Sequence, residues 1–342
     1  MSRYGAREEN HHDETGQDRT ADTLRARDGI ESLRSAILTS DAIVIGAGSG
    51  LSTAAGFRYS GKFFERYFGD FMRKYGIRDM YSGGFFPFPA REEFWAWWSR
   101  HIWLNRYAPL PGNLYSLLLS IVRDRDFFVL TTNVDHCFQR AGFDKKRLFY
   151  TQGDYGLFQS SRPHGASLGK TYDNEEMVRE MLLSQGFSIG TDGELLLPED
   201  GSPRMEIDSG LIPHCPDDGL EMAPNLRSDD TFVEDDGWHE AAGRYADFLA
   251  VHGIKATGFF TEDGIAETNR TYGGRMLFLE LGVGRNTPGI IKYPFWQMTF
   301  GTENARYACV SLNDAYAPPE IRERSVCIDR DLKETIEELA RN

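Results

Sequence analysis

Basic residues are scarce in this chain relative to acidic ones. Its 342 residues include 38 Lys and Arg but 52 Asp and Glu, which gives a formal net charge of -14 and a pI near 5.1. A protein that binds nucleic acid or an anionic membrane surface needs clustered positive charge to neutralise phosphate groups. The composition therefore argues against both kinds of partner.

Cysteine is also rare, and no two cysteines stand close enough to form a CxxC pair. This pattern gives neither a disulfide framework nor an obvious zinc site, and it favours a reducing, cytoplasmic environment. The segment HCPDDG at residues 214–219 could bind a metal, but a solvated turn is the favoured interpretation. We expect no structural metal. The four cysteines are Cys137, Cys215, Cys309 and Cys327.

Long apolar runs are absent as well. No stretch approaches the length of a membrane span. The first 28 residues contain the polar segment EENHHDETGQDRT, with neither the apolar core of a signal peptide nor a periodicity that could pack. We predict a disordered tail over residues 1–28.

The segment AIVIGAGSGLSTAAGF at residues 42–57 has the opposite character. A β-branched run typical of a buried parallel strand stops at Gly46, Gly48 and Gly50. A turn with so little side-chain bulk lets backbone N–H groups approach a pyrophosphate. The GxGxxG fingerprint is only half met, because Leu51 stands where its last glycine would be, and a tight turn without a ligand would look similar.

Three further apolar runs end in small or polar residues. FFVL leads into TTNVD at 131–135, MLFLEL leads into GVGRNTPG at 282–289, and the run at 307–312 ends at Asn313. Such residues at the carboxyl ends of parallel strands point into a ligand crevice. The repetition favours an α/β nucleotide-binding fold over packing alone.

The remaining segments predict mostly helices. Helical periodicity covers residues 114–122, 171–185 and 238–252, and Asp331 is expected to cap a last helix to residue 340. The aromatic-rich stretch at 63–103 suits helical packing better than a lid. We also predict a hairpin that joins 194–197 to 205–207, and a short strand at 231–233. Residues 253–274 suggest an insertion.

Taken in order, these motifs resemble the sirtuins. The segments GAGSGLSTAAGF, TTNVD, TQGDYG, NLRSDDTFVED and ELGVGRNTPGIIKYPF are most similar to the macrodomain-linked branch called class M. The resemblance covers about residues 40–313, with a poorer match between 155 and 212. It implies a Rossmann-like, sirtuin-type NAD-binding domain over 29–153 and 236–342, with a small zinc-free domain inserted at 154–235.

The resemblance places one group of residues on the pyrophosphate and adenosine side of NAD. The backbone of the glycine turn would cradle the pyrophosphate. The glycine-rich end of the strand at 276–281 and the residue after the fourth strand would line the adenosine. These residues are Gly46, Ala47, Gly48, Gly282, Val283, Gly284, Asn286 and Asn313.

A second group would lie on the nicotinamide side. There the amide and the carboxylate of TTNVD would hold nicotinamide and its ribose, beside two residues from the end of the glycine-rich segment. Arg58 receives no role, because its spacing departs from the usual sirtuin pattern. The residues in this group are Ser52, Phe57, Thr132, Asn133 and Asp135.

Gln152 occupies the position at which deacylating sirtuins carry a catalytic histidine. A neutral amide cannot take a proton at pH 7, but it can orient a ribose or an acceptor through hydrogen bonds. Gln152 therefore joins Asn133 and Asp135 as a catalytic candidate. Asp154 is expected to be loop structure, and His136 is expected to point away from its neighbour Asp135 and not to replace the base.

The predicted function is an NAD-dependent protein ADP-ribosyltransferase with little or no deacylase activity. The class M resemblance implies a lipoyl-carrier acceptor related to the glycine-cleavage H protein, and a macrodomain hydrolase that reverses the modification. Three alternatives stay open: an NAD glycohydrolase, an NAD or ADP-ribose sensor without turnover, and, last, a lysine deacylase.

Overall fold

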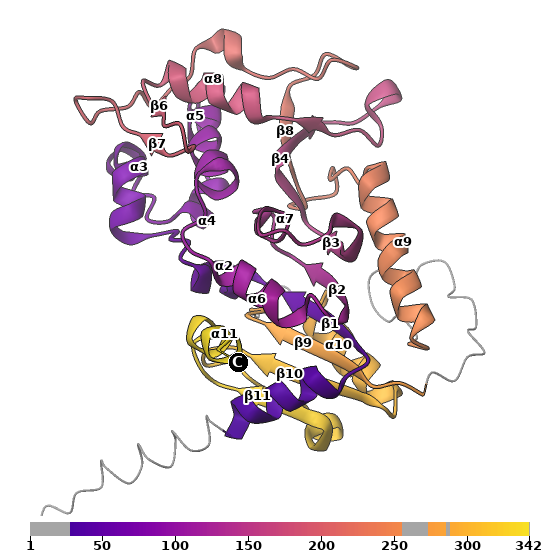
Figure 1. The fold of residues 1–342 in the computed structure, drawn as a ribbon. Helices are drawn as coiled ribbons and strands as arrows, with labels where there is room; N and C mark the ends of the chain where they lie inside the picture. Colours follow the sequence, from indigo (N-terminus) through magenta and orange to yellow (C-terminus); the bar gives the residue numbers. More distant parts are fainter. Residues whose placement is uncertain (1–27, 255–272, 285–287, 342) are drawn as a thin grey trace, which may run out of the picture.

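The computed structural model describes residues 28–254, 273–284 and 288–341. Its larger unit is a six-stranded sheet in the order β11-β10-β9-β1-β2-β3, in which every neighbouring pair is parallel (Figure 1). The predicted α/β fold with a parallel sheet is confirmed. The strands are β1 (Ala42–Ala47), β2 (Asp126–Thr131), β3 (Leu148–Tyr150), β9 (Met276–Leu281), β10 (Ala305–Val310) and β11 (Ser325–Ile328).

Helices cover both faces of this sheet. Ile43 and Ile45 of β1 face a core shared with the helix at 28–39, α2 (Ser49–Ala55), α6 (Leu114–Val122) and α11 (Leu332–Leu339). Ala42 and Val44 face the opposite core, which α9 (Asp236–Val251) and α10 (Lys292–Gly301) complete. Both faces of each central strand are buried, which is why these strands are continuously apolar in sequence.

Most elements of the sheet domain were predictable. The four predicted strands agree with β1, β2, β9 and β10 to within about two residues, and the helix at 114–122 is α6. Asp331 caps α11, accepting a hydrogen bond from the backbone N–H of Glu334. The predicted tail at 1–28 and the predicted insertion at 253–274 lie almost wholly outside the described residues.

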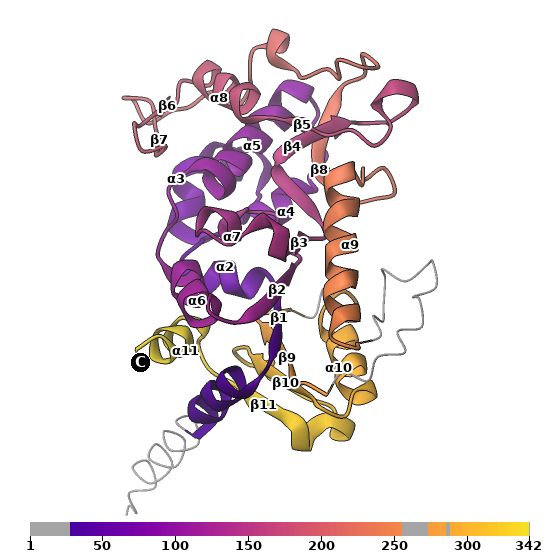
Figure 2. The same cartoon turned by 45° about the vertical axis from the view of Figure 1, so that its right-hand side comes forward.

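A second, smaller unit lies beyond the β3 edge of the sheet, and α9 runs from the sheet up to strand β8 of this unit (Figure 2). We call it the small unit. Its core buries aromatic rings such as Phe64, Phe68 and Trp97, so the preference for packing over a lid is confirmed for these rings. Its elements are α3 (Gly61–Tyr75), α4 (Met80–Gly84), α5 (Arg91–Ile102), η1 (Trp103–Tyr107), α8 (Glu175–Ser184) and the sheet β5-β4-β8, formed by β5 (Tyr172–Asp173), β4 (Gly153–Ser160) and β8 (Met222–Leu226).

The predicted inserted domain at 154–235 remains a prediction, but the packing adds a feature to it. The aromatic core of the small unit draws residues from 64–107 as well as from 158–222. Two segments of the chain therefore build the small unit together, and the first of them precedes β2 in the sequence.

The predicted hairpin between 194–197 and 205–207 is wrong. β7 (Leu195–Leu196) pairs instead with β6 (Ser188–Ile189), across a turn closed by hydrogen bonds between Gly190 and Glu194 and between Gly193 and Gly190. The backbone N–H of Ile207 donates to Glu92 of α5, and the Ile207 side chain is buried. Packing against α5 thus replaces strand pairing.

The strand expected at 231–233 is also absent, and β8 at 222–226 takes its place. Val233 is buried, but side-chain amides satisfy its backbone. Its N–H donates to Oε1 of Gln159, and its carbonyl accepts from Nδ2 of Asn225. Two amide side chains, one of them 74 residues away in sequence, therefore satisfy the backbone that a neighbouring strand would pair with, and sequence periodicity does not reveal such contacts.

Candidate functional site

The glycine turn after β1 crosses the loop after β9 at close range. The N–H of Gly48 donates to the carbonyl of Leu281 at 3.1 Å, and the N–H of Gly50 donates to that of Gly282 at 3.0 Å. A Cβ on Gly48 would lie 2.7 Å from the Gly282 carbonyl oxygen, and one on Gly50 would lie 2.8 Å from it. Gly282 itself has a positive φ of 60°. These positions require glycine because two backbone segments cross there, whether or not a ligand binds.

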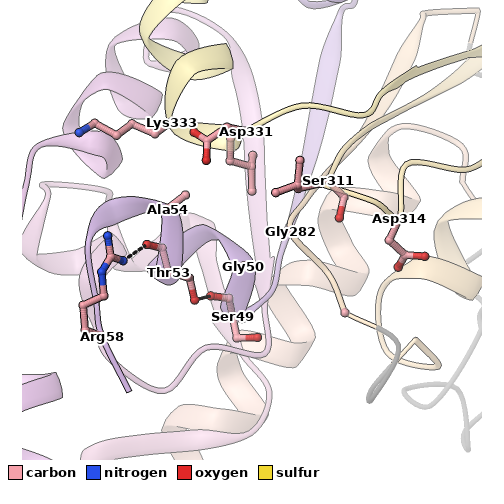
Figure 3. Close-up of a pocket in the computed structure, with 13 residues that line it drawn as sticks. Ser49, Gly50, Thr53, Ala54, Arg58, Gly282, Ser311, Asp314, Asp331 and Lys333 are labelled. Carbon is pink, nitrogen blue, oxygen red and sulfur yellow. Dashed lines mark hydrogen bonds between the residues drawn. The ribbon is translucent and has the colours of Figure 1, made fainter. Parts of the chain in front are cut away.

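A cavity of about 660 Å³ opens beside this crossing, and we call it the larger cavity. Figure 3 shows that its walls come from four places in the chain: α2 and the residues after it, the loop after β9, the end of β10 and the start of α11. No side chain caps the N-terminus of α2. The residues that line the larger cavity are Ser49, Gly50, Thr53, Ala54, Arg58, Gly282, Gly284, Ser311, Leu312, Asp314, Asp331, Leu332 and Lys333.

A second cavity of about 400 Å³, the inner cavity, lies between the sheet and the small unit. Ser49 and Thr53 line both cavities, so the two spaces are neighbours at the first turns of α2. The inner cavity is lined by Ser49, Ser52, Thr53, Tyr59, Tyr81, His101, Thr132, Asn133, Val134, Asp135 and Tyr155.

Ser52 is the centre of a buried hydrogen-bond network on one wall of the inner cavity. Its hydroxyl donates to Oδ2 of Asp135 at 2.5 Å and lies 2.9 Å from the Tyr115 hydroxyl. Nδ2 of Asn133 donates to the Ser52 hydroxyl at 3.1 Å and to the Gly48 carbonyl at 3.0 Å. The amide and the carboxylate predicted from TTNVD therefore come together with Ser52, as expected from the order of the motifs.

Burial shifts the pKa values of the two acidic side chains in this network, Asp135 and Tyr115. Burial raises the pKa of the Asp135 carboxyl above its ordinary value, against hydrogen bonds from Ser52 and the Cys137 backbone, which lower it. Burial, followed by the charge of Asp135, also raises the pKa of Tyr115. The tyrosine is therefore a neutral hydrogen-bonding group at physiological pH.

Gln152 follows β3 and stands apart from this network. Its side chain is half-buried, Nε2 donates to the Thr151 hydroxyl at 3.3 Å, and its backbone carbonyl accepts from the N–H of Arg227 at 3.0 Å. Gln152 is not among the residues that line the larger or the inner cavity. Its catalytic role stays a prediction.

Asp154 corrects the expectation of a loop residue. It lies in β4, is 4% exposed, and accepts hydrogen bonds from Nε of Arg106 at 2.8 Å and from Nδ1 of His136 at 2.5 Å. Burial acts to raise its pKa, but the hydrogen bond from His136 and the charge of Arg106 outweigh that effect and lower it. This carboxylate joins η1, β4 and the loop before α7 (Cys137–Arg140).

His136 adopts the left-handed conformation with φ 63° and pairs with Asp154. Unlike Asp135, it is not among the residues that line the inner cavity. The position of its ring supports the expectation that His136 does not replace the missing base.

The other predicted residues fall into two groups, those that reach a cavity and those that serve the core. Thr132 lines the inner cavity, and Gly282 and Gly284 line the larger one. Asn313, with φ 61°, lines a third space of about 260 Å³ beside Lys292. Asn286 lies outside the described residues. The core positions are Gly46, which faces Ile291 and Phe295, and Ala47, Phe57 and Val283, which are buried.

Several residues that line the cavities were not predicted. Arg58, Ser311 and Lys333 line the larger cavity, and Tyr59, Tyr81, His101 and Tyr155 line the inner one. Arg58 could have been found, because it follows the glycine-rich segment directly. Lys333, Tyr81, His101 and Tyr155 come from helices and a strand whose sequence patterns indicate only packing, and Ser311 and Tyr59 come from loops without a recognisable motif.

Two further properties bear on the type of site. Among the described residues, no three His, Cys, Asp or Glu side chains gather in a way that could hold a metal ion. In the same part of the chain, no helix is both long and apolar enough to cross a bilayer.

Comparisons with known proteins complete the description. The chain is similar to a protein ADP-ribosyltransferase of Staphylococcus aureus (strain Mu50), with 33% identity over 313 residues that cover 91% of this chain and 87% of the relative. It is 26% identical over 262 residues to a probable bifunctional ADP-ribose hydrolase/ADP-ribosyltransferase of Fusarium oxysporum f. sp. cubense, covering 75% of this chain but 38% of that longer protein. No family model matches the chain.

Solved structures show the same fold at low identity. Sir2Tm bound to a propionylated peptide matches with a TM-score of 0.51 and 16% identity, covering 91% of this chain and 96% of that one. A mutant Sir2 homologue in complex with ADP-ribose matches with a TM-score of 0.51 and 14% identity, covering 91% and 95%.

Proposed function

This chain belongs to the protein ADP-ribosyltransferase family with the sirtuin fold, and on that basis we propose that it transfers ADP-ribose from NAD to a lipoyl-carrier protein related to the glycine-cleavage H protein. NAD is the ADP-ribose donor of this family. The observation that supports the proposal most directly is that Ser49 and Thr53 border both the larger and the inner cavity. An elongated dinucleotide needs two such spaces joined end to end.

The larger cavity suits the adenosine and pyrophosphate half of NAD. It combines the uncapped N-terminus of α2, at Ser49 and Gly50, with the cations Arg58 and Lys333. Backbone N–H groups and positive side chains are the groups that hold pyrophosphate oxygens. The tight crossing at Gly282 keeps the floor of this space free of side chains.

The inner cavity suits the nicotinamide half. Asn133 offers an amide and Asp135 a carboxylate, and Ser52 fixes both through the network described above. When NAD is bound, it supplies an ADP-ribosyl group with nicotinamide as the leaving group. The Asp135 carboxylate can stabilise positive charge that develops next to it, and it costs little to orient because Ser52 and the Cys137 backbone already hold it.

Gln152 supports transfer over deacylation. Deacylation by the sirtuin route needs a base to activate a ribose hydroxyl, and the neutral amide cannot accept that proton. His136 pairs with Asp154 and does not line the inner cavity, and His101, which does line it, has a pKa lowered to about 3 by burial. In the proposed reaction, Gln152 orients the acceptor or the ribose by hydrogen bonding.

The lipoyl-carrier acceptor rests on the resemblance to class M sirtuins. The same resemblance suggests a macrodomain hydrolase as the partner that removes the modification. The name of the Fusarium oxysporum relative supports this pairing, because it joins an ADP-ribose hydrolase and an ADP-ribosyltransferase in one protein.

The test measures both products of the reaction. A lipoylated carrier protein is incubated with NAD and the enzyme, its intact mass is recorded, and nicotinamide release is followed in parallel. We expect a gain of one ADP-ribose on the carrier. Asn133→Ala and Gln152→Ala should each reduce the rate on the order of 100-fold, whereas the exposed helix variant Gln297→Ala should match the wild type.

Other outcomes separate the alternatives. Nicotinamide release without a modified carrier would identify a glycohydrolase. NAD binding without either product would identify a sensor. Full activity of Gln152→Ala would remove the assigned role of that residue.

A further inference from the structure

The inner cavity has a second wall, opposite the Ser52 network, that the proposed function has not used. It is built by the small unit and contributes Tyr59, Tyr81, His101 and Tyr155. Three phenols and an imidazole are unusual for a wall that only packs against a ring. This wall therefore has its own hydrogen-bonding chemistry.

His101 and Tyr155 form a direct pair on this wall. Nε2 of His101, in α5, lies 2.9 Å from the hydroxyl of Tyr155, in β4, and the two rings meet edge to face with centroids 5.0 Å apart. His101 is 3% exposed. The pair joins two segments of the small unit 54 residues apart in sequence.

The backbone of Tyr155 is fixed as firmly as its hydroxyl. Its N–H donates to the Val134 carbonyl at 2.9 Å, within the loop that carries Asn133 and Asp135, and its carbonyl accepts from Nδ2 of Asn174 at 2.8 Å. The phenol is therefore held in a set position relative to the Asp135 wall, and such preorganisation is what a positioning residue requires.

Both members of the pair are uncharged at neutral pH. Burial lowers the pKa of His101 to about 3, opposed only by the Met80 backbone carbonyl. Burial, and after it the charge of Asp135, raises the pKa of Tyr155. A neutral imidazole of such low basicity is a poor general base, but the paired phenol keeps a free hydrogen-bonding valence beyond the one that His101 uses.

The inner cavity also offers room for more than nicotinamide. At about 30 Å³ per water molecule, its roughly 400 Å³ would hold about a dozen waters. One pyridine ring with its amide fills only part of this space, and the Ser52 network already provides polar groups for it. Tyr155, which borders the inner cavity, lies three residues after Gln152 in the sequence.

On the premise of the proposed transferase function, we propose that Tyr155, oriented by His101, positions the nucleophilic group of the acceptor protein for attack on the NAD ribose. Its hydroxyl hydrogen-bonds the nucleophile and holds it facing the Asp135 wall. The bond between the nucleophile and ribose C1′ forms as the bond from C1′ to nicotinamide breaks, nicotinamide leaves, and the proton of the nucleophile passes to solvent. The pair itself takes up no proton and carries no charge. It is a specificity device that favours a protein nucleophile over water.

The first test is Tyr155→Phe, which removes one hydroxyl and keeps the ring. With NAD and a lipoylated carrier protein as probes, we expect kcat/KM for the carrier to fall on the order of 10-fold, while the Kd for NAD stays within a factor of two or so of wild type. The ratio of modified carrier to free ADP-ribose should fall as well. A residue needed only for the fold would not change that ratio selectively.

The second test changes His101, which orients the Tyr155 hydroxyl in the proposal. His101→Phe should reproduce the effect of Tyr155→Phe, and the double variant should be no worse than either alone, because the two residues act as one unit. His101→Gln, whose amide can replace Nε2, should recover part of the loss. Tyr172→Phe is the matched control, since it removes a phenol that donates to Asp217 outside both cavities.

The outcomes that overturn the inference are distinct from those that overturn the proposed function. A weaker NAD affinity with unchanged carrier kinetics would assign the pair to nicotinamide, and unchanged behaviour of both variants would leave it no role. Should Tyr155→Phe fail to fold, the difference between His101→Phe and His101→Gln decides. A wild-type enzyme that modifies no carrier refutes the transferase function itself.

Discussion

Asp135 and Asp154 are both buried beside the candidate site, yet their surroundings shift their pKa values in opposite directions. Asp154 faces the cation Arg106 and the ring of His136, and its pKa falls. Asp135 accepts hydrogen bonds from Ser52 and Cys137, and its pKa rises because burial, with a smaller effect from the charge of Asp154, outweighs them. At the scale of single residues, Asp154 links elements of the structure and Asp135 faces the inner cavity.

This difference gives Ser52→Ala a defined pH dependence. The Ser52 hydroxyl lowers the pKa of Asp135, so its removal should raise that pKa further. If the ionised carboxylate supports nicotinamide release, activity is lost as pH falls through this pKa, and the acid limb of the profile should move to higher pH. Rates of nicotinamide release measured against pH for both proteins check this. An unmoved limb would show that Asp135 does not set it.

Ser52→Ala should also change how the free energy of unfolding depends on pH. A raised folded pKa means that Asp135 favours folding in its protonated form, and this contribution is lost as pH rises through the folded value. Ser52→Ala should therefore lower the free energy of unfolding by about 2 kcal/mol at pH values above the pKa of Asp135, where the hydroxyl binds a charged partner, and by less below that pKa. Urea unfolding at two pH values measures the difference, with the exposed variant Ser120→Ala as control.

At the scale of elements, the site depends on how closely α2 approaches the loop after β9. Gly48, Gly50 and Gly282 let two backbones cross at hydrogen-bonding distance, and this crossing sets the floor of the larger cavity. The glycines that suggested a nucleotide are thus explained jointly by chain crossing and by the space beside it. A tight turn required by packing and a turn that leaves room for a nucleotide are therefore compatible interpretations of this segment.

Gly50→Ala tests this arrangement. The new Cβ would lie 2.8 Å from the oxygen and 2.9 Å from the Cα of Gly282, both backbone atoms that cannot rotate away. We expect a loss of about 1–3 kcal/mol in stability and a Kd for NAD at least about 10-fold weaker. Calorimetry measures both quantities.

The matched control is Gly243→Ala in α9. Nothing lies within 4 Å of the added Cβ, so the substitution should stabilise the helix by up to about 1 kcal/mol and leave NAD binding unchanged. Equal affinity for NAD in Gly50→Ala and the wild type would contradict the placement of the dinucleotide beside the crossing.

At the scale of the whole molecule, the sheet and the small unit keep separate hydrophobic cores, and the inner cavity lies where they meet. Its two walls come from different units, so substrate binding and acceptor positioning depend on their relative placement. Asp154, with partners from η1 and the loop before α7, is one of the contacts that fixes this placement.

If NAD occupies both cavities, it should stabilise the folded chain more than its two halves do. At 100-fold excess over its Kd, NAD should add about 2.7 kcal/mol to the free energy of unfolding, seen as a rise in Tm of a few degrees. AMP and nicotinamide added together at the same concentrations should add less, because two molecules lose more translational freedom than one. Equal shifts would indicate two independent sites.

Particular residues show how far sequence reasoning reached. The strands, α6 and the cap at Asp331 were predictable because each depends on a local apolar run or a local hydrogen bond. The hairpin at 194–207 was misassigned because Ile207 packs against α5, more than a hundred residues earlier in the chain. Asn133 and Asp135 were found through their motif, whereas His101 and Tyr155 belong to elements that signal only packing.

The sequence by itself determined the order of the elements, the family and the residues at the ends of the strands, because hydrophobic runs and short motifs are local properties. Only the tertiary structure decided which side chains meet. It made the two cavities neighbours at Ser49 and Thr53, made Asp154 a buried link instead of the expected loop residue, and brought His101 to Tyr155. Contacts between distant segments follow from the packing of whole elements, which leaves no periodic signal in the chain.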